Sequence, residues 1–245
     1  MSGRIGRASS VANVAMHRLR QWDFVAAQRP DDMIAISSAV RARILKTYRR
    51  ESHIVFPPLR EALLRRPLVE HGDYYVMLSR LVPYKRVDLA VQAFAGGGRR
   101  LVIVGTGPLL SELKRIASAN VTFTGWVDDS TAIDLLAHAK ALVFPGEEDF
   151  GIVPVEAQAV GCPVIAYNAG GVVDTVTQGE TGIFFREQTT DALREALATF
   201  EAHTWEPRVA RRNAERFAEP QFLQGLRNIL ALHGVGEEAW VQSRS

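Results

Sequence analysis

The sequence predicts an α/β protein whose larger part is a doubly wound, mostly parallel six-stranded sheet. From Asp73 onward, short runs rich in Val, Ile, Leu and Phe alternate with helix-length amphipathic runs, which is typical of repeated βα units. The strand runs are almost continuously apolar, as expected for strands buried on both faces. A chain of 245 residues with 47% hydrophobic content can bury the core that such a sheet requires.

The first 57 residues follow a different pattern. Their expected elements are a helix over 11–28, a strand over 31–38, a helix over 39–50 and a strand over 53–58 that stops at two prolines. Such a series buries too little surface to fold alone. It therefore predicts a small αβαβ remnant of a second α/β domain, followed by a linker over 58–72 that carries prolines and mixed charge.

The elements of the main sheet follow in order. Its strands are expected at 74–79, 101–105, 121–125, 141–146, 163–168 and 181–185. Its helices are expected at 87–94, 109–117, 130–139, 152–160 and 172–177, with three more after Thr189. Sheets of this kind bind ligands beyond the carboxyl ends of their strands. The loops that follow the strands are therefore where we expect the site.

Composition excludes several classes of protein. A formal net charge of +2 produces no large field for nucleic acid or anionic lipid. The basic residues Arg41, Arg43, Lys46, Arg49 and Arg50 are expected on a solvated helix face, with membrane-surface contact as the alternative. The single Cys162, the lack of a long apolar run and the polar start favour the cytoplasm, with the inner face of the membrane as the alternative.

Acidic residues surround a glycine-marked helix start. Residues 147–149 are acidic, Gly151 is expected to open a helix with Pro154 in its first turn, and Glu156 lies on that helix. The free amides of a helix N-terminus favour an anion such as phosphate. Carboxylates, in contrast, accept hydrogen bonds from hydroxyl groups. The combination predicts a ligand with phosphate in the middle and hydroxyl-bearing rings at both ends, as in a sugar nucleotide.

Three other loops suit such a ligand. Arg80 and Lys85 follow the first strand of the sheet, where they are placed to neutralise a diphosphate. The glycines of residues 105–108 are expected to let the backbone approach a ligand closely. Trp126 and Val127 follow the third strand, in a loop with room for a flat base, with a partly buried packing role as the equal alternative for Trp126. All these loops are predicted at one edge of one sheet.

Taken together, SRLVPYKR, VGTGP, FTGWVDD and FPGEEDFGIVPVEAQAVGCPVIAYNAGGVVDTVTQGETGIFF resemble the donor-binding half of retaining glycosyltransferases with the two-domain GT-B fold, of the glycosyl transferases group 1 or family four type. The match by motif covers about residues 73–185. Glu148 and Glu156 meet that family's pattern of two glutamates separated by seven residues. The resemblance implies that the sheet is Rossmann-like and forms the C-terminal half of a GT-B fold, beside the remnant of a second Rossmann-like domain.

The same resemblance implies the domain boundaries. Residues 1–57 are then the remnant of an N-terminal acceptor domain, and 58–72 are the linker. Residues 73–219 are the nucleotide-sugar donor-binding domain, 220–233 form a C-terminal helix that crosses back to the N-terminal domain, and 234–245 form a tail.

Site roles also follow from the resemblance. Arg80 and Lys85 would bind the diphosphate and stabilise it as the leaving group, and Glu148 would hold hydroxyl groups of the transferred sugar. These three are the implied catalytic residues. The implied donor-binding residues are Val127 at the base, Phe150, Gly151, Ile152 and Val153 at phosphate and sugar, and Glu156 at the ribose diol. No covalent carboxylate intermediate is expected, so Glu148 is not cast as a nucleophile.

The implied reaction is transfer of a hexose, with GDP-mannose the favoured donor and a UDP-sugar second, to a glycan or lipid-linked acceptor. No metal is expected, because no Asp-x-Asp motif occurs. The sequence departs from the family in that about half of the expected enzyme, including the acceptor site, is missing. A fragment that binds donor but transfers little, a partner chain that supplies the missing half, a donor-binding module without activity, and an epimerase or phosphorylase relative therefore remain as alternatives.

Overall fold

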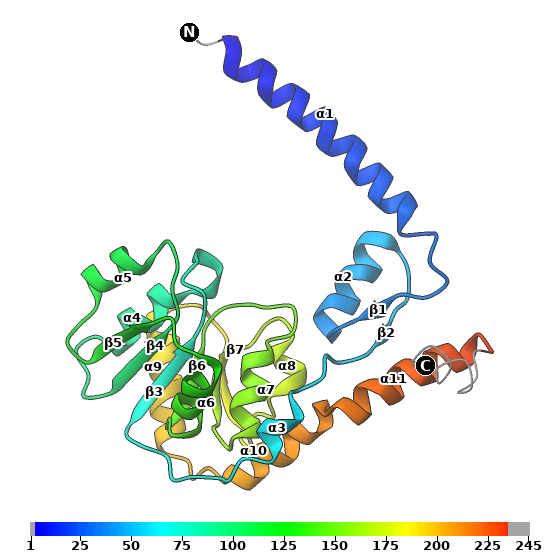
Figure 1. The fold of residues 1–245 in the computed structure, drawn as a ribbon. Helices are drawn as coiled ribbons and strands as arrows, with labels where there is room; N and C mark the ends of the chain where they lie inside the picture. The colour runs from blue at the N-terminus through cyan, green and yellow to red at the C-terminus, as the bar shows by residue number, and fades with distance from the viewer. Residues whose placement is uncertain (1–2, 235–245) are drawn as a thin grey trace.

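A computed structural model describes residues 3–234, and its main body is a six-stranded sheet in which every neighbouring pair of strands is parallel (Figure 1). The strand order is β5-β4-β3-β6-β7-β8. The strands are β3 (Tyr74–Leu78), β4 (Arg100–Val104), β5 (Val121–Gly125), β6 (Ala141–Phe144), β7 (Val164–Tyr167) and β8 (Gly182–Phe185). This confirms the predicted doubly wound α/β fold.

Helices cover both faces of the sheet. One layer contains α4 (Val87–Phe94), α5 (Leu110–Ile116) and α9 (Thr190–Glu201). The other contains α3 (Glu61–Leu64), α6 (Asp129–Ala137), α7 (Ile152–Ala159), α8 (Val172–Thr175) and α10 (Pro207–Ala214). Side chains of a strand alternate between the two layers. On β6, Val143 packs into the first core, and Leu142 and Phe144 pack into the second.

The N-terminal unit is smaller than the sequence predicts. Its strands β1 (Ile34–Ala35) and β2 (His53–Ile54) are two residues long and pair in parallel on either side of α2 (Ser38–Tyr48). The expected strands were longer. Within residues 3–234 neither β1 nor β2 pairs with a third strand. Their length is therefore limited to the residues over which the two strands pair with each other. Helix α1 (Gly3–Ala26) begins earlier than predicted and extends away from the rest of the molecule (Figure 1).

The segment expected as a linker, residues 58–72, is partly packed into the core. Leu59 and Leu63, on either side of the start of α3, are almost fully buried. The amide of Leu59 donates to the carbonyl oxygen of Phe217 at 2.6 Å, which joins this segment to the 3-10 helix η2 (Glu215–Phe217). The side chains and the backbone bond thus hold the segment in one place.

The C-terminal helix α11 (Glu219–Leu232) runs back toward the N-terminal unit (Figure 1). His233, which follows the helix, contacts the carboxylate of Asp32. Gly225 lies against Val55, where a Cβ atom at position 225 would be 3.1 Å from a methyl group. Of the expected tail, residues 235–245 lie outside the described residues. In the described part of the chain, no helix has the length and apolar character needed to cross a bilayer.

Candidate functional site

The two central strands, β3 and β6, are neighbours, and the chain winds away from them in opposite directions. From β3 it continues to β4 and β5 on one side, and from β6 to β7 and β8 on the other. A crevice forms at such a switch point, beyond the carboxyl ends of the two strands. The loops that follow β3 and β6 carry Lys85 and Glu148. Topology alone therefore brings these two predicted residues to one place.

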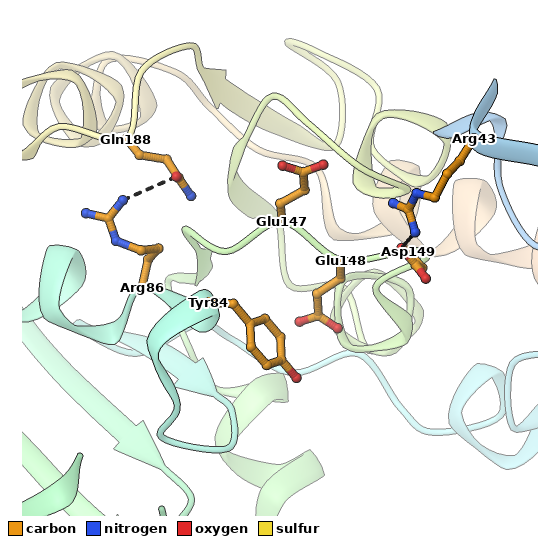
Figure 2. A pocket seen from close by; sticks show the side chains of 7 residues that line it. All are labelled: Arg43, Tyr84, Arg86, Glu147, Glu148, Asp149 and Gln188. Carbon is orange, nitrogen blue, oxygen red and sulfur yellow. Dashed lines mark hydrogen bonds and ion pairs between the residues drawn. The ribbon is translucent and has the colours of Figure 1, made fainter. Parts of the chain in front are cut away.

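A hollow of about 600 Å³ lies at this edge (Figure 2). Its lining residues are Arg43, Tyr84, Arg86, Glu147, Glu148, Asp149 and Gln188. Figure 2 shows Arg86 beside Gln188 at one end and Arg43 beside Asp149 at the other, with Glu147 and Glu148 between them. Tyr84, Arg86 and Gln188 were not predicted as site residues, because single polar or aromatic residues of these types form no distinctive pattern in the sequence.

Lys85 and Glu148 form an ion pair. Only 15% of the Lys85 side chain and 24% of the Glu148 side chain are exposed, so the attraction is screened less by water than at an open surface. The backbone makes this approach possible at Gly146. A Cβ atom at position 146 would lie 2.9 Å from the Cα atom of Lys85, closer than real carbon atoms approach. The glycine that ends the β6 run thus allows the pair to form.

Two consecutive glycines after β7 lie against the backbone of the acidic loop, residues 147–149. A Cβ atom at Gly170 would lie 2.3 Å from the carbonyl oxygen of Glu148, and one at Gly171 would lie 2.4 Å from that of Asp149. The amide of Gly171 also donates to the Glu148 carbonyl oxygen at 2.8 Å. The sequence analysis gave these glycines no role. In the sequence, the only indication of a role was a pair of glycines shortly after an expected strand.

The glycines of residues 105–108 lie against the backbone of the loop that follows β3. A Cβ atom at Gly105 would lie 2.0 Å from the carbonyl oxygen of Ser79, and one at Gly107 would lie 2.4 Å from that of Leu81. The amide of Leu81 donates to the Thr106 carbonyl oxygen at 2.9 Å. This close approach of two backbone segments holds the part of the chain that leads to Lys85.

The N-terminus of α7 lies beside the acidic loop. Gly151 has a φ of 81°, which favours glycine, and Pro154 occupies the first turn as predicted. Phe150 and Gly151 are buried, Ile152 is exposed and Val153 is half-buried. The unpaired amides at the start of α7 place the positive end of the helix dipole beside the acidic loop.

Glu156 lies further along α7 and has a different partner. Only 13% of its side chain is exposed, and Arg60 donates to it at 2.8 Å. Burial raises the pKa of Glu156, whereas the charge of Arg60 opposes that rise. Lys85 and Glu148 thus contact each other directly. Glu156 is paired instead with Arg60, which also contacts Asp129, and it is not among the residues that line the hollow.

Other predicted residues are less enclosed. Arg80 is exposed, and it has no ion pair within the described residues. Val127 is half-buried and packs against the core, while Trp126 is 78% exposed. Arg43 was expected on a solvated helix face and Asp149 in a solvated loop. Both side chains are more than half exposed, as expected, and they form an ion pair of 2.8 Å at the edge of the hollow.

Comparison with known proteins identifies the family. The model of the family described as glycosyl transferases group 1 matches residues 61–217, which is more than half of the chain. The chain belongs to the glycosyl transferases group 1 family. The predicted resemblance is therefore confirmed.

Individual members of the group 1 glycosyltransferases resemble parts of this chain. A GDP-mannose-dependent alpha-(1-6)-phosphatidylinositol monomannoside mannosyltransferase of Mycobacterium tuberculosis is 38% identical over 160 residues, which cover 58% of this chain and 42% of the relative. The chain thus spans less than half the length of that relative.

Solved structures with similar folds include the lipopolysaccharide outer core galactosyltransferase WaaB, with a TM-score of 0.72 and 18% identity over 83% of this chain and 62% of WaaB. Another is the Anabaena protein HepE in complex with UDP and glucose, with a TM-score of 0.68 and 20% identity over 84% of this chain and 64% of HepE. At these identities the likeness concerns the fold, and it agrees with a Rossmann-like half of a GT-B fold.

Proposed function

We propose that this chain forms the donor-binding part of a retaining glycosyltransferase, which transfers a hexose, with mannose favoured, from a nucleoside diphosphate sugar to a glycan or lipid-linked acceptor. The observation that carries the proposal is the Lys85–Glu148 ion pair at the switch point, in a chain of the group 1 family. A cation for phosphate and a carboxylate for sugar hydroxyls lie together where this fold binds ligands.

Departure of a nucleoside diphosphate builds up negative charge on phosphate oxygens. In the proposed reaction Lys85 and Arg80 stabilise this charge, together with the amides of Gly151, Ile152 and Val153 at the α7 N-terminus. Because these groups supply positive charge, the proposal requires no metal ion. When phosphate binds Lys85, the carboxylate of Glu148 becomes available to accept hydrogen bonds from the sugar.

The two ends of the donor are proposed to bind on opposite sides of the diphosphate. Glu156 accepts hydrogen bonds from the ribose diol, and the main chain of Val127 contacts the base. The Phe150 backbone lies toward the sugar. Glu148 orients the sugar and does not attack it, so the acceptor attacks from the same face that the diphosphate leaves.

The donor and acceptor are argued from the relatives. The mycobacterial relative is described as GDP-mannose-dependent and as acting on a phosphatidylinositol monomannoside, which favours GDP-mannose and a lipid-linked acceptor. A UDP-sugar is the second candidate, since HepE was solved with UDP. A lipid-linked acceptor would bring the protein to the cytoplasmic face of a membrane as a peripheral protein.

Calorimetric titration with GDP, UDP and ADP tests this proposal. GDP is expected to bind most tightly and UDP next, with affinities that EDTA does not change. Addition of labelled GDP-mannose and a mannosyl phosphatidylinositol acceptor then measures transfer. If none of the three nucleotides binds, the proposed donor site is refuted. If EDTA removes binding, the metal-free part of the proposal is refuted.

A further inference from the structure

Arg60 lies outside every loop in which the sequence predicts a site residue. It immediately precedes the short helix α3, in the segment expected to be a linker. Its neighbour Leu59 is almost fully buried and its amide is bonded to Phe217, and Leu63 on α3 is buried too. Because the backbone on both sides is held in the core, the side chain of Arg60 has a fixed origin from which to reach α7.

From this origin the guanidinium contacts two carboxylates. Its Nε and Nη2 atoms donate to Oε1 of Glu156 at 3.1 and 2.8 Å. Its Nη1 atom donates to Oδ2 of Asp129 at 2.8 Å. Both bonds to Glu156 therefore use the same carboxylate oxygen. Oε2 of Glu156 accepts no hydrogen bond from any residue that the structure describes.

The second contact ties Glu156 to the loop expected to bind the base. Asp129 is the first residue of α6, directly after the loop that contains Trp126 and Val127. A planar guanidinium with several donors in fixed directions can hold two groups in a set geometry, which an ammonium group cannot do. Arg60 thereby links the carboxylate on α7 to the start of α6.

We propose that Arg60 is a positioning residue that orients Glu156 for the ribose of the nucleotide, by engaging Oε1 and leaving Oε2 to accept from the hydroxyl groups. This inference rests on the proposed function, because it needs Glu156 as the ribose acceptor. Arg60 itself does not contact the nucleotide. Its role is to fix the direction of a carboxylate that would otherwise have several rotamers.

Electrostatics give Arg60 a second effect on the same carboxylate. The charged groups that face Glu156 are Arg60, before α3, and Asp129, on α6. Burial raises the pKa of Glu156 and Asp129 raises it further, whereas Arg60 lowers it. Without Arg60, two carboxylates would face each other with no cation between them. Glu156 would then take up a proton at a higher pH and lose part of its capacity to accept hydrogen bonds.

The test compares GDP binding by the wild-type chain, Arg60→Gln and Arg65→Gln, by calorimetry between pH 8 and pH 5.5. Arg65 is the matched control, because it ends the same short helix, is 73% exposed and pairs only with its neighbour Glu61 within the described residues. Arg60→Gln is expected to bind GDP about three- to tenfold more weakly at pH 6. Its affinity should begin to fall at a higher pH than that of the wild type, and Arg65→Gln should follow the wild type.

A second readout isolates the ribose. The ratio of the affinities for GDP and 2′-deoxy-GDP is expected to shrink in Arg60→Gln and to stay unchanged in Arg65→Gln. Arg60→Lys keeps a cation beside Glu156, so it should keep the wild-type pH dependence while losing part of the ribose discrimination. This variant also provides the measurement if Arg60→Gln does not fold.

The inference is overturned if Arg60→Gln shows the pH profile and the ribose discrimination of Arg65→Gln. Where only Arg60→Lys folds, the inference is overturned if that variant shows the ribose discrimination of Arg65→Gln. In that case nucleotide binding by the wild type would still support the proposed function. If the wild type binds no nucleoside diphosphate, the proposed function fails first. The two failures are therefore distinguishable.

Discussion

Glu148 and Glu156 are carboxylates of the same motif, yet their surroundings differ. Glu148 lies before α7, is paired with Lys85 and borders the hollow. Glu156 lies on α7, is more deeply buried and is paired with Arg60. The two glutamates therefore differ in their charged partner and in the burial of their side chains. In the proposed function, the carboxylate beside Lys85 holds the sugar, and the carboxylate held by Arg60 accepts hydrogen bonds from the ribose.

Substitution of each carboxylate should separate these roles. Glu156→Ala is expected to weaken nucleoside diphosphate binding by about 1–3 kcal/mol, because charged hydrogen bonds to the ribose are lost. Glu148→Ala should spare nucleotide affinity and impair sugar transfer. Titration with GDP and a transfer assay measure the two effects. An equal loss of nucleotide affinity in both variants would contradict the assignment.

Gly171 provides a second test at the level of single residues. A methyl group at this position would lie 2.4 Å from the carbonyl oxygen of Asp149, so Gly171→Ala must displace the acidic loop. We expect a loss of stability of about 1–3 kcal/mol and weaker GDP binding. Gly98→Ala is the control, because a Cβ atom there meets nothing within 4 Å. Denaturant unfolding and titration measure both properties. Wild-type GDP affinity in Gly171→Ala would show that the glycine is not needed to shape the loop.

At the scale of elements, the helix starts determine where the site loops end. Helix α6 begins with a side-chain cap, in which Asp128 accepts a hydrogen bond from the amide of Thr131 at 2.8 Å. This bond lowers the pKa of Asp128, because it favours the charged form. The cap fixes the point at which the loop containing Val127 becomes helix.

Removal of this cap should weaken the start of α6. Asp128→Ala is expected to unfold at a lower urea concentration than the wild type, since an amide at the helix N-terminus loses its partner. Asp128→Asn should retain most of the stability because asparagine also caps helices well. Urea unfolding measures the difference, with Ser130→Ala on the same helix as a control. The cap would be unimportant if Asp128→Ala and Ser130→Ala unfolded at the same urea concentration.

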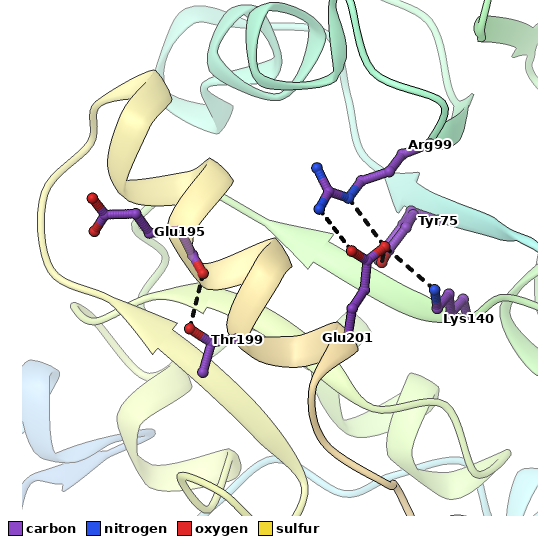
Figure 3. Close-up of polar contacts among 6 residues, drawn as sticks. All are labelled: Tyr75, Arg99, Lys140, Glu195, Thr199 and Glu201. Atoms are coloured by element: carbon purple, nitrogen blue, oxygen red, sulfur yellow. Dashed lines mark hydrogen bonds and ion pairs between the residues drawn. The ribbon is translucent and has the colours of Figure 1, made fainter.

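At the scale of the whole molecule, a polar cluster joins several elements at the end of the sheet where β3, β4 and β6 begin (Figure 3). Glu201, at the end of α9, accepts hydrogen bonds from Arg99 at 2.6 Å and from the hydroxyl group of Tyr75 at 2.8 Å. Lys140 lies 3.3 Å away. The cluster connects β3, the start of β4, the start of β6 and the last turn of α9.

The cluster predicts a dependence of stability on pH. Hydrogen bonds from Arg99, chiefly, and from Tyr75 lower the pKa of Glu201 from 4.5 to about 2. Because the folded-state pKa is depressed, this stabilisation is fully present above about pH 4.5 and is lost as the pH falls toward 2. Glu201→Gln should therefore unfold at a lower temperature than the wild type at pH 7, and the difference should shrink below pH 4.5.

Thermal unfolding at a series of pH values measures this difference. Glu195→Gln is the matched control, because Glu195 is an exposed carboxylate on the same helix and Figure 3 draws its carboxylate without a partner among the residues shown. A gap between Glu201→Gln and the wild type that stays constant from pH 7 to pH 3 would contradict the role of the charge.

The sequence by itself determined the fold class, the order of the elements and which loops lie at the edge of the sheet where the candidate site is. These depend on local patterns, such as apolar strand runs, amphipathic helices and the Gly151–Pro154 helix start, which are present wherever the segment lies in space. The position of α4, Val87–Phe94, was predicted without error for that reason. Lys85 and Glu148 were also predictable together, because parallel strands end at a common edge.

Only the tertiary structure decided which side chains pair across that edge. Arg60 and Glu156 are 96 residues apart, and Arg43 and Asp149 are 106 residues apart. No local pattern records such contacts, since they depend on where the segments that carry Arg43 and Arg60 lie relative to the loop before α7 and to α7 itself. The contacts of Gly105 and Gly171 were likewise not predictable, because the sequence does not indicate which backbone segment lies against a glycine.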